Sequence, residues 1–170
     1  MLGKDYAEQD CALARALEVV GERWTLLILR DAFYGVRRFN EFHAHLDIPR
    51  AVLSDRLSAL VADGVLDRVP DPEHGGRYLY ELSQSGRELW PALHALMSWG
   101  SRNRHPSSRD FLHAPCDALL DDDGRCSRCG RTPGPDEIVT RPRAGRRSRR
   151  TDPVAVALRD PHPLLEPLEV

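Results

Sequence analysis

The sequence predicts a mainly α-helical fold with one small β-hairpin. Two helical patterns stand close together at residues 38–46 (RFNEFHAHL) and 49–63 (PRAVLSDRLSALVAD), with a short turn between them. Two strand-like segments follow at residues 65–69 and 77–82, and the link that joins them, PDPEHGG, is rich in turn-forming residues. A helix, a tight turn, a second helix and a hairpin behind it together predict a winged helix-turn-helix.

Flanking helices complete this unit. Asp10 is a candidate N-cap for a first helix over residues 10–20, in which apolar residues recur at helical spacing. The segment at residues 24–33 (WTLLILRDAF) is apolar on most faces and is therefore expected at the centre of the core. Ser83 is placed to cap a last long helix that ends near Asn103, with apolar residues spaced for burial against a partner.

The second helix of the central pair has one bare face. Pro49 suits its first helical position, and Gly64 suits the left-handed position just past its end. An apolar stripe follows helical spacing through Leu53, Leu57, Leu60 and Val61. The opposite side carries Ala51, Asp55 and Ser58 and is left free for a partner.

Beyond residue 104 the composition changes twice. Residues 1–104 form the winged helix-turn-helix domain with its flanking helices, and residues 105–140 contain three of the four cysteines. Residues 141–170 begin with the basic run RPRAGRRSRR and continue with a Pro-bearing segment, so we expect a disordered basic tail. Its six Arg residues within 141–150 fit nonspecific phosphate binding, an acidic partner or no function equally well.

Charge and hydropathy limit the classes of function. The formal net charge is −2, and residues 1–104 hold 13 basic and 15 acidic side chains. Bulk charge therefore neither supports nor excludes a nucleic-acid partner, and any basic surface must arise from local arrangement. No apolar run reaches the roughly 18–20 residues that span a bilayer, and the N-terminus lacks signal-peptide features, so we expect a cytoplasmic protein without a membrane partner.

Several blocks of residues in order carry a family resemblance. They are Cys11-Ala-Leu-Ala-Arg-Ala-Leu17, Val20-Gly-Glu-Arg-Trp-Thr-Leu-Leu-Ile-Leu-Arg30, Arg38-Phe39-Asn-Glu-Phe42, Ile48-Pro-Arg-Ala-Val-Leu53, Leu57 to Gly64, Tyr80-Glu-Leu-Ser83, Gly86 and Trp99. Over residues 9–103 the chain resembles the HxlR-type winged-helix regulators, which are related to MarR. The resemblance implies DNA binding by residues 1–104, a homodimer formed through the first and last helices, and a palindromic double-stranded DNA operator. It also implies that Cys11 is a redox sensor, because oxidant-sensing members carry a reactive Cys at the start of the first helix.

The DNA contacts are expected around the second helix of the pair and the hairpin. A helix N-terminus attracts phosphate, Arg reads a guanine edge with two donors, and glycines let a backbone approach a groove. The alternative is that several of these Arg residues only form solvent-exposed ion pairs on the protein surface. The predicted contact residues are Arg37, Arg38, Pro49, Arg50, Ala51, Val52, Ser54, Arg56, His74, Gly75, Gly76 and Arg77. Asp55 is better explained by an ion pair than by a DNA contact.

Cys11 has two interpretations. Just after the predicted N-cap, the helix dipole favours its thiolate and so a reaction with oxidants or electrophiles. Against this, Asp10 disfavours a second negative charge nearby, and a lone Cys on a helix is commonly a small packing residue.

The other three cysteines form a pattern with one histidine, His113-x2-Cys116-x9-Cys126-x2-Cys129, followed by Gly130. Three thiolates and an imidazole in two closely spaced pairs suit a structural zinc ion, and the region 105–140 would then be a small zinc-ribbon-like appendage. A Cys126–Cys129 redox pair and three idle thiols are the alternatives.

Three classes of function remain in view. The leading one is a homodimeric repressor released by a thiol-reactive signal or by a small-molecule effector bound between the first helix and the helix that carries Trp90 and Trp99. The second is a small thiol oxidoreductase or metal-binding protein that uses Cys126 and Cys129, and the third is an adaptor that keeps the fold without binding DNA. The sequence holds no evident nucleophile–base set, paired carboxylates or phosphate loop, so we do not expect an enzyme.

Overall fold

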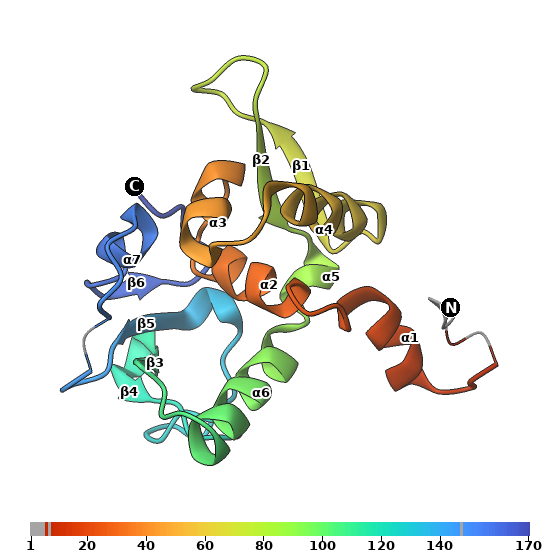
Figure 1. Cartoon of the computed structure of the whole chain (residues 1–170). Coiled ribbons are helices and arrows are strands. Elements are labelled where there is room, and N and C mark those ends of the chain that lie inside the picture. Colours follow the sequence, from red (N-terminus) through yellow and green to blue (C-terminus); the bar gives the residue numbers. More distant parts are fainter. Residues whose placement is uncertain (1–5, 7, 147) are drawn as a thin grey trace.

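Helix α2 (Thr25–Phe33) lies at the centre of the core, as its apolar sequence predicts. The computed structural model describes residues 6, 8–146 and 148–170. Ile28, Leu29 and Phe33 are fully or almost fully buried, and α2 contacts α3 (Phe39–Leu46), α6 (Trp90–Asn103) and the second strand of the hairpin. Figure 1 shows α2 between the helix pair above it and α6 below.

The predicted winged helix-turn-helix is confirmed. Helix α3 ends at Asp47, whose φ of 52° gives the left-handed turn into α4 (Arg50–Ala62). Strands β1 (Leu66–Pro70) and β2 (Tyr78–Leu82) pair antiparallel, from Leu66 opposite Leu82 to Pro70 opposite Tyr78. The hairpin extends well beyond the body of the molecule as the wing (Figure 1).

The long helix predicted after Ser83 is broken in two. Ser83 does cap α5 (Gln84–Arg87), since its Oγ accepts a hydrogen bond from the Gly86 amide at 3.1 Å. A new helix, α6, then starts at Trp90 and has Pro91 in its first turn. Pro91 has no N–H to donate to the Arg87 carbonyl, and its ring would clash with that carbonyl, so one continuous helix cannot pass through this point. None of the described helices is both long and apolar enough to cross a membrane.

A four-stranded antiparallel sheet follows α6, in the order β4-β3-β5-β6. Its strands are β3 (Arg109–His113), β4 (Ala118–Leu119), β5 (Ile138–Pro142) and β6 (His162–Pro163), with single 3-10 turns at Ala114–Cys116 and Pro135–Glu137. Phe111 on β3 joins this sheet to the helices, because its ring packs edge-on against Trp90 at 5.2 Å between centroids and lies 6.4 Å from Tyr34.

The expected disorder of residues 141–170 is wrong for the part of this segment that the structure describes. It continues β5, forms α7 (Pro153–Ala157) and β6, and buries Val154, Leu158, Leu164 and Leu168 in the main core. Asp152 holds α7 in place, since its Oδ1 accepts the Ala155 amide at 3.0 Å and lies 2.8 Å from His45 Nδ1 on α3. The basic run at residues 141–150 precedes a short apolar segment, and this segment is ordered by packing against residues far away in the chain.

The C-terminal segment also runs against the end of α2. The amide of Leu165 donates to the Phe33 carbonyl at 2.8 Å, and the amide of Leu168 donates to the Gly35 carbonyl at 3.0 Å. Gly35 has φ +85°, and a Cβ there would lie 1.8 Å from the Glu166 carbonyl oxygen. Only glycine permits this close approach of the two backbones.

Two valines on α7 provide a matched test of this packing. Val154 is fully buried and Val156 is 42% exposed. We expect Val154→Ala to lower the free energy of unfolding by about 2 kcal/mol, because it removes buried methyl groups and leaves a cavity. Val156→Ala should change it by less than about 0.5 kcal/mol. Urea unfolding of both variants decides, and equal stabilities would mean that α7 does not pack as described.

Candidate nucleic-acid interface and thiol cluster

Helix α4 presents a bare face to solvent, as predicted. Leu53, Leu57 and Leu60 are buried, and the other side of the helix is exposed at Ala51, Ser54, Asp55 and Ser58. Val52 is half-buried and packs against the core, so less of its side chain faces outward than that of Ala51. Pro49 is the exposed N-cap residue, and the free amides of the first turn follow it.

The two predicted arginines of α4 are both held by neighbours. The Arg50 Nη2 donates to Asn40 Oδ1 at 3.0 Å, and its guanidinium lies 5.2 Å from the centre of the Phe39 ring on α3. Arg56 Nη1 lies 3.7 Å from Glu22 Oε1. Arg50 therefore remains exposed beside the bare face in a fixed position, and Arg56 lies at the edge toward the α1–α2 turn.

The wing tip gathers the remaining predicted contacts. His74, Gly75, Gly76 and Arg77 are all exposed, and Gly76 has φ +77°. The loop is closed by backbone bonds from the Asp71 amide to the Arg77 carbonyl at 3.0 Å and from the Arg77 amide to the His74 carbonyl at 3.1 Å. Sequence reasoning missed exposed Arg68 on β1, whose guanidinium lies 3.6 Å from the centre of the Tyr78 ring.

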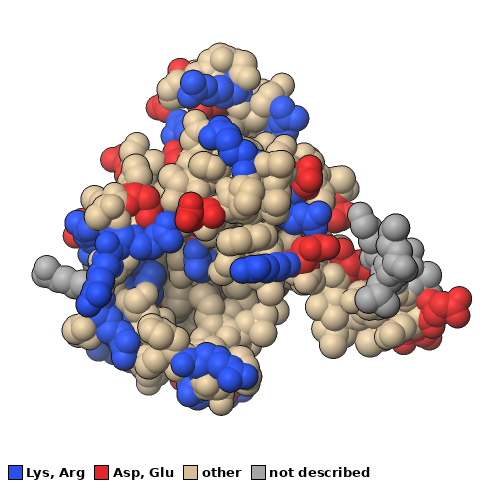
Figure 2. Space-filling model, viewed as in Figure 1, with Lys and Arg blue, Asp and Glu red and all other residues tan. Residues whose placement is uncertain are grey.

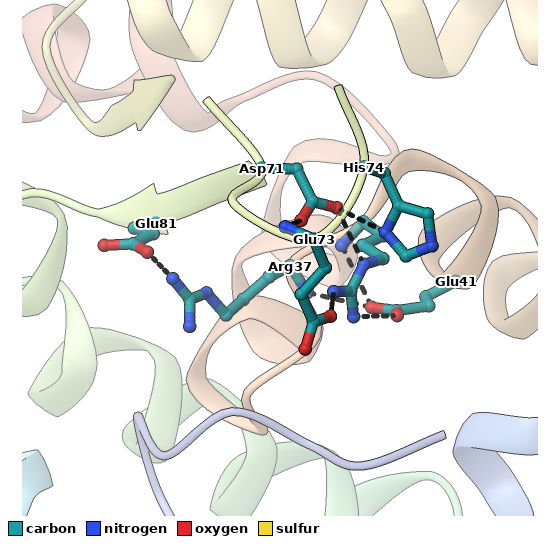
Figure 3. A network of polar contacts seen from close by, with 7 residues as sticks. Arg37, Glu41, Asp71, Glu73, His74 and Glu81 are labelled. Carbon is teal, nitrogen blue, oxygen red and sulfur yellow. Dashed lines mark hydrogen bonds and ion pairs between the residues drawn. The ribbon is translucent and has the colours of Figure 1, made fainter. Parts of the chain in front are cut away.

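Arg37 and Arg38 lie in an ion-pair network at the base of the wing. Figure 3 shows Arg37 and the carboxylates of this network. Arg38 contacts three carboxylates: Asp71 Oδ2 at 3.1 Å, Glu73 Oε2 at 2.5 Å and Glu41 Oε1 at 3.4 Å. Arg37 pairs with Glu81 on β2. Both guanidiniums thus join α3 to the wing, and a phosphate would have to compete with these carboxylates.

Asp71 is the hub of this network. Its burial opposes ionisation, but the Glu73 amide, the Arg38 guanidinium and His74 all donate to its carboxylate and lower its pKa to about 2. A carboxyl with a lowered pKa stabilises the fold above its ordinary pKa near 3.8, and that contribution is lost as the pH falls through about 2. At neutral pH the Asp71 carboxylate is therefore charged and pairs with Arg38, which links the wing to the start of α3.

Charge is distributed in patches over the surface (Figure 2). Arg side chains lie on the wing and along the side formed by the C-terminal segment, with Asp and Glu side chains between them. This pattern agrees with the near-balanced composition of residues 1–104 and with a surface that depends on a few placed cations.

Helix α1 (Ala12–Val20) stands away from the body of the molecule (Figure 1). Leu13 is 65% exposed and Leu17 is 40% exposed. The two side chains are four residues apart and so form one exposed apolar face of α1. Cys11, not Asp10 as predicted, is the N-cap residue, and it is exposed. Exposed apolar side chains also occur on α2 and α6, at Leu27, Leu96 and Trp99.

Four metal-ligating side chains meet in the C-terminal sheet, and we call them the thiol–imidazole cluster: His113, Cys116, Cys126 and Cys129. One ligand atom from each lies within 4.8 Å of all the others, so these residues could hold a metal ion. Burial opposes ionisation of Cys126, but backbone amides of Cys129 and Arg128 and the His113 side chain lower its pKa to about 6. Burial and the neighbouring sulfurs raise the pKa of Cys116 to about 11.

A cavity of about 1340 Å³ separates α2 and α6 from the C-terminal segment. Its apolar lining includes Leu27, Tyr34 and Leu93, and its cationic lining includes Arg30, Arg109 and Arg159. Arg109 donates to Thr140 Oγ1 at 2.8 Å and to the Leu158 carbonyl at 2.5 Å, and its buried Nη2 has no hydrogen-bond partner in the described part of the chain. The space predicted for an effector, between α1 and α6, is not this cavity, because α1 does not line it.

The bare helix beside a wing defines a winged helix-turn-helix transcriptional regulator, and comparison with known proteins identifies the family. The chain belongs to the HxlR-like helix-turn-helix family, whose model matches residues 19–108. It is 44% identical over 134 residues to the HTH-type transcriptional regulator Rv3095 of Mycobacterium tuberculosis, covering 76% of this chain and 81% of that protein. It is also 34% identical over 97 residues to YvaP of Bacillus subtilis, covering 56% and 90%.

Solved structures agree with this assignment. The candidate transcription factor PA1607 superimposes with a TM-score of 0.55 at 34% identity, covering 72% of this chain and 98% of that one. The redox regulator HypR in its reduced form gives a TM-score of 0.51 at 30% identity, covering 55% and 94%. The predicted family resemblance is thus confirmed.

Proposed function

We propose that this chain is a homodimeric repressor that binds a palindromic operator and acts in the cytoplasm as a DNA-binding protein, not as an enzyme. The observation that carries the proposal is the bare face of α4 beside an outstretched wing. A helix of this kind enters the major groove, and a wing tip with two glycines can approach the adjacent minor groove.

Direct reading is assigned to the first turns of α4. Arg50 is exposed and pre-positioned by Asn40 and Phe39, so it can donate to a guanine edge without losing much side-chain freedom. Ala51 is available for a thymine methyl group, and Ser54 for phosphate. Arg37 and Arg38, which are paired with carboxylates, contribute chiefly by orienting the wing. The wing in turn brings His74 and Arg77 to the DNA.

Arg77 offers a matched test of the wing contact, since Arg125 is another exposed arginine and lies in the C-terminal sheet region. We expect Arg77→Ala to weaken operator binding about tenfold and to reduce the salt dependence by about one phosphate contact, and Arg125→Ala to do neither. The operator is first recovered from bound genomic fragments, where we expect a palindrome near the regulator's own promoter or an adjacent gene. Fluorescence anisotropy at several salt concentrations provides the measurement. Identical curves for both variants would remove the wing from the interface.

The homodimer is assigned to α1, α2 and α6. These helices leave Leu13, Leu27, Leu96 and Trp99 between 36% and 65% exposed, and an isolated helix such as α1 gains stability only when its apolar face is covered. A second copy of this chain is the natural occupant, because a symmetric dimer would present two α4 helices to the two halves of a palindrome.

Charge placed on this surface should prevent assembly. We expect Leu13→Glu to convert a dimer of about twice 19.2 kDa into a monomer of 19.2 kDa, because a carboxylate would be buried in the apolar interface. Leu119→Glu is the control, since Leu119 is 44% exposed on β4, in the C-terminal sheet. Light scattering coupled to size-exclusion chromatography measures the mass, and a Leu13→Glu variant that stays dimeric contradicts the proposed interface.

The signal is assigned to Cys11. Its thiol is exposed at the start of α1, the helix assigned to the dimer, and the similar protein HypR is a redox regulator. Addition of an electrophile to this sulfur, or a disulfide between the two Cys11 residues of a dimer, would move α1 and change the spacing of the two α4 helices on the operator.

Replacement of this single sulfur tests the switch. Diamide takes two electrons and two protons from a pair of thiols and should release the wild-type protein from the operator. We expect Cys11→Ser to bind the operator normally and to stay bound in the presence of diamide. Electrophoretic mobility shifts with and without diamide give the measurement. If Cys11→Ser also releases DNA on diamide treatment, the Cys11 switch is wrong, and the free thiols of Cys116, Cys126 and Cys129 become the ones to examine.

A further inference from the structure

The thiol–imidazole cluster is built from two turns with the same ligand spacing. In each, two ligands are separated by two residues and followed by a residue with positive φ: Asp117 (φ 45°) after Cys116 and Gly130 (φ 72°) after Cys129. The Asp117 amide donates to the Ala114 carbonyl at 3.3 Å, and the Gly130 amide donates to the Cys126 carbonyl at 2.8 Å. Both turns therefore curl their two ligand side chains toward one point.

The distances suit a tetrahedral ion. With zinc–sulfur bonds of about 2.3 Å and zinc–nitrogen bonds of about 2.0 Å, ligand atoms at tetrahedral corners lie about 3.5–3.8 Å apart. Cys129 Sγ lies 3.5 Å from His113 Nδ1, and all four ligand atoms lie within 4.8 Å of one another. A contraction of about an ångström closes the site.

The second nitrogen of His113 supports the same conclusion. The imidazole is buried, and its Nε2 has no hydrogen-bond partner among the described residues. Glu137 Oε1 lies 3.9 Å from this atom. A histidine that binds a metal through one ring nitrogen commonly directs the other N–H to a carboxylate, which fixes the ring. Burial of the ring in this orientation is otherwise costly.

Strand β4, next to the cluster, has few contacts of its own that would hold it in place. Strand β4 has two residues and pairs with β3 through only the register Leu112–Leu119 and His113–Ala118. Phe111 and Ile138 anchor β3 and β5 in the main core, but β4 and the loop that follows it are mostly exposed. A bound metal can hold such a segment in place.

We propose that the thiol–imidazole cluster binds one structural Zn²⁺. Three sulfur ligands and one imidazole favour zinc over harder ions, and four protein ligands leave no position for a substrate. The ion would fix the end of β3, and Phe111 on the same strand packs against Trp90 and against His94, at 5.7 Å between the Phe111 and His94 ring centroids. Zinc at this point would thus stabilise the contact of the sheet with α6.

Metal content of the purified full-length protein tests the site. After dialysis against metal-free buffer we expect one zinc per chain by mass spectrometry of the metals, and about a tenth of that or less in Cys126→Ser. Cys11→Ser is the matched control and should keep one zinc per chain. Zinc-free unmodified protein, or full zinc in Cys126→Ser, overturns the proposal.

Two measurements on the unmodified chain keep the test decisive if Cys126→Ser does not fold. Cobalt exchanged into the protein should give the intense visible bands of a tetrahedral thiolate site, whereas weak bands of an octahedral ion would indicate adventitious binding and contradict the proposal. A strong chelator should lower the Tm by about 10 °C. A metal-free protein whose Cys126 and Cys129 thiols reduce an insulin disulfide, are themselves oxidised to a Cys126–Cys129 disulfide and are regenerated by added dithiothreitol would support the thiol oxidoreductase in place of the zinc site.

Discussion

Burial of helix α2 fixes the positions of α3, the wing and α6, and α3 and β1 in turn hold α4. Six of its nine residues are buried, and they contact α3 and β2 on one side and α6 on the other. The backbone at its end receives the returning C-terminal segment through the Phe33 and Gly35 carbonyls. A tightly packed interior transmits displacement, so the reading helix, the proposed dimer surface and the C-terminal sheet share one support.

The domain proposed to bind DNA, residues 1–104, carries little net charge. Arg38 lies among three carboxylates and Arg37 pairs with Glu81, so two arginines that the sequence predicts as DNA contacts already have partners within the chain. Fewer free cations weaken nonspecific attraction to any duplex, and in the function we propose specificity would depend on placed groups such as Arg50 and Arg77. The loss of affinity is smaller if the wing is already fixed before it meets DNA, because little ordering entropy is lost on binding.

Two sulfur sites have opposite surroundings. Cys11 is exposed at the end of a helix that its own chain hardly covers, which suits a residue that reacts. The thiol–imidazole cluster buries His113 and Cys126 in a sheet attached to the core by Phe111, which suits a residue set that stabilises. We therefore place the proposed signal at the dimer helix and the proposed metal in the scaffold.

Local patterns in the chain predict the elements from α1 to β2 to within two residues, because periodicity, Gly64 and the turn-rich link are local signals. Ligand spacing alone also identifies the four members of the thiol–imidazole cluster. Other features appear only in the folded molecule. The pairing of Arg38 with Asp71 spans 33 residues, and the segment after β5 packs against α2 and α3. Contacts between residues far apart in the chain leave no periodic trace, so only the folded chain shows them.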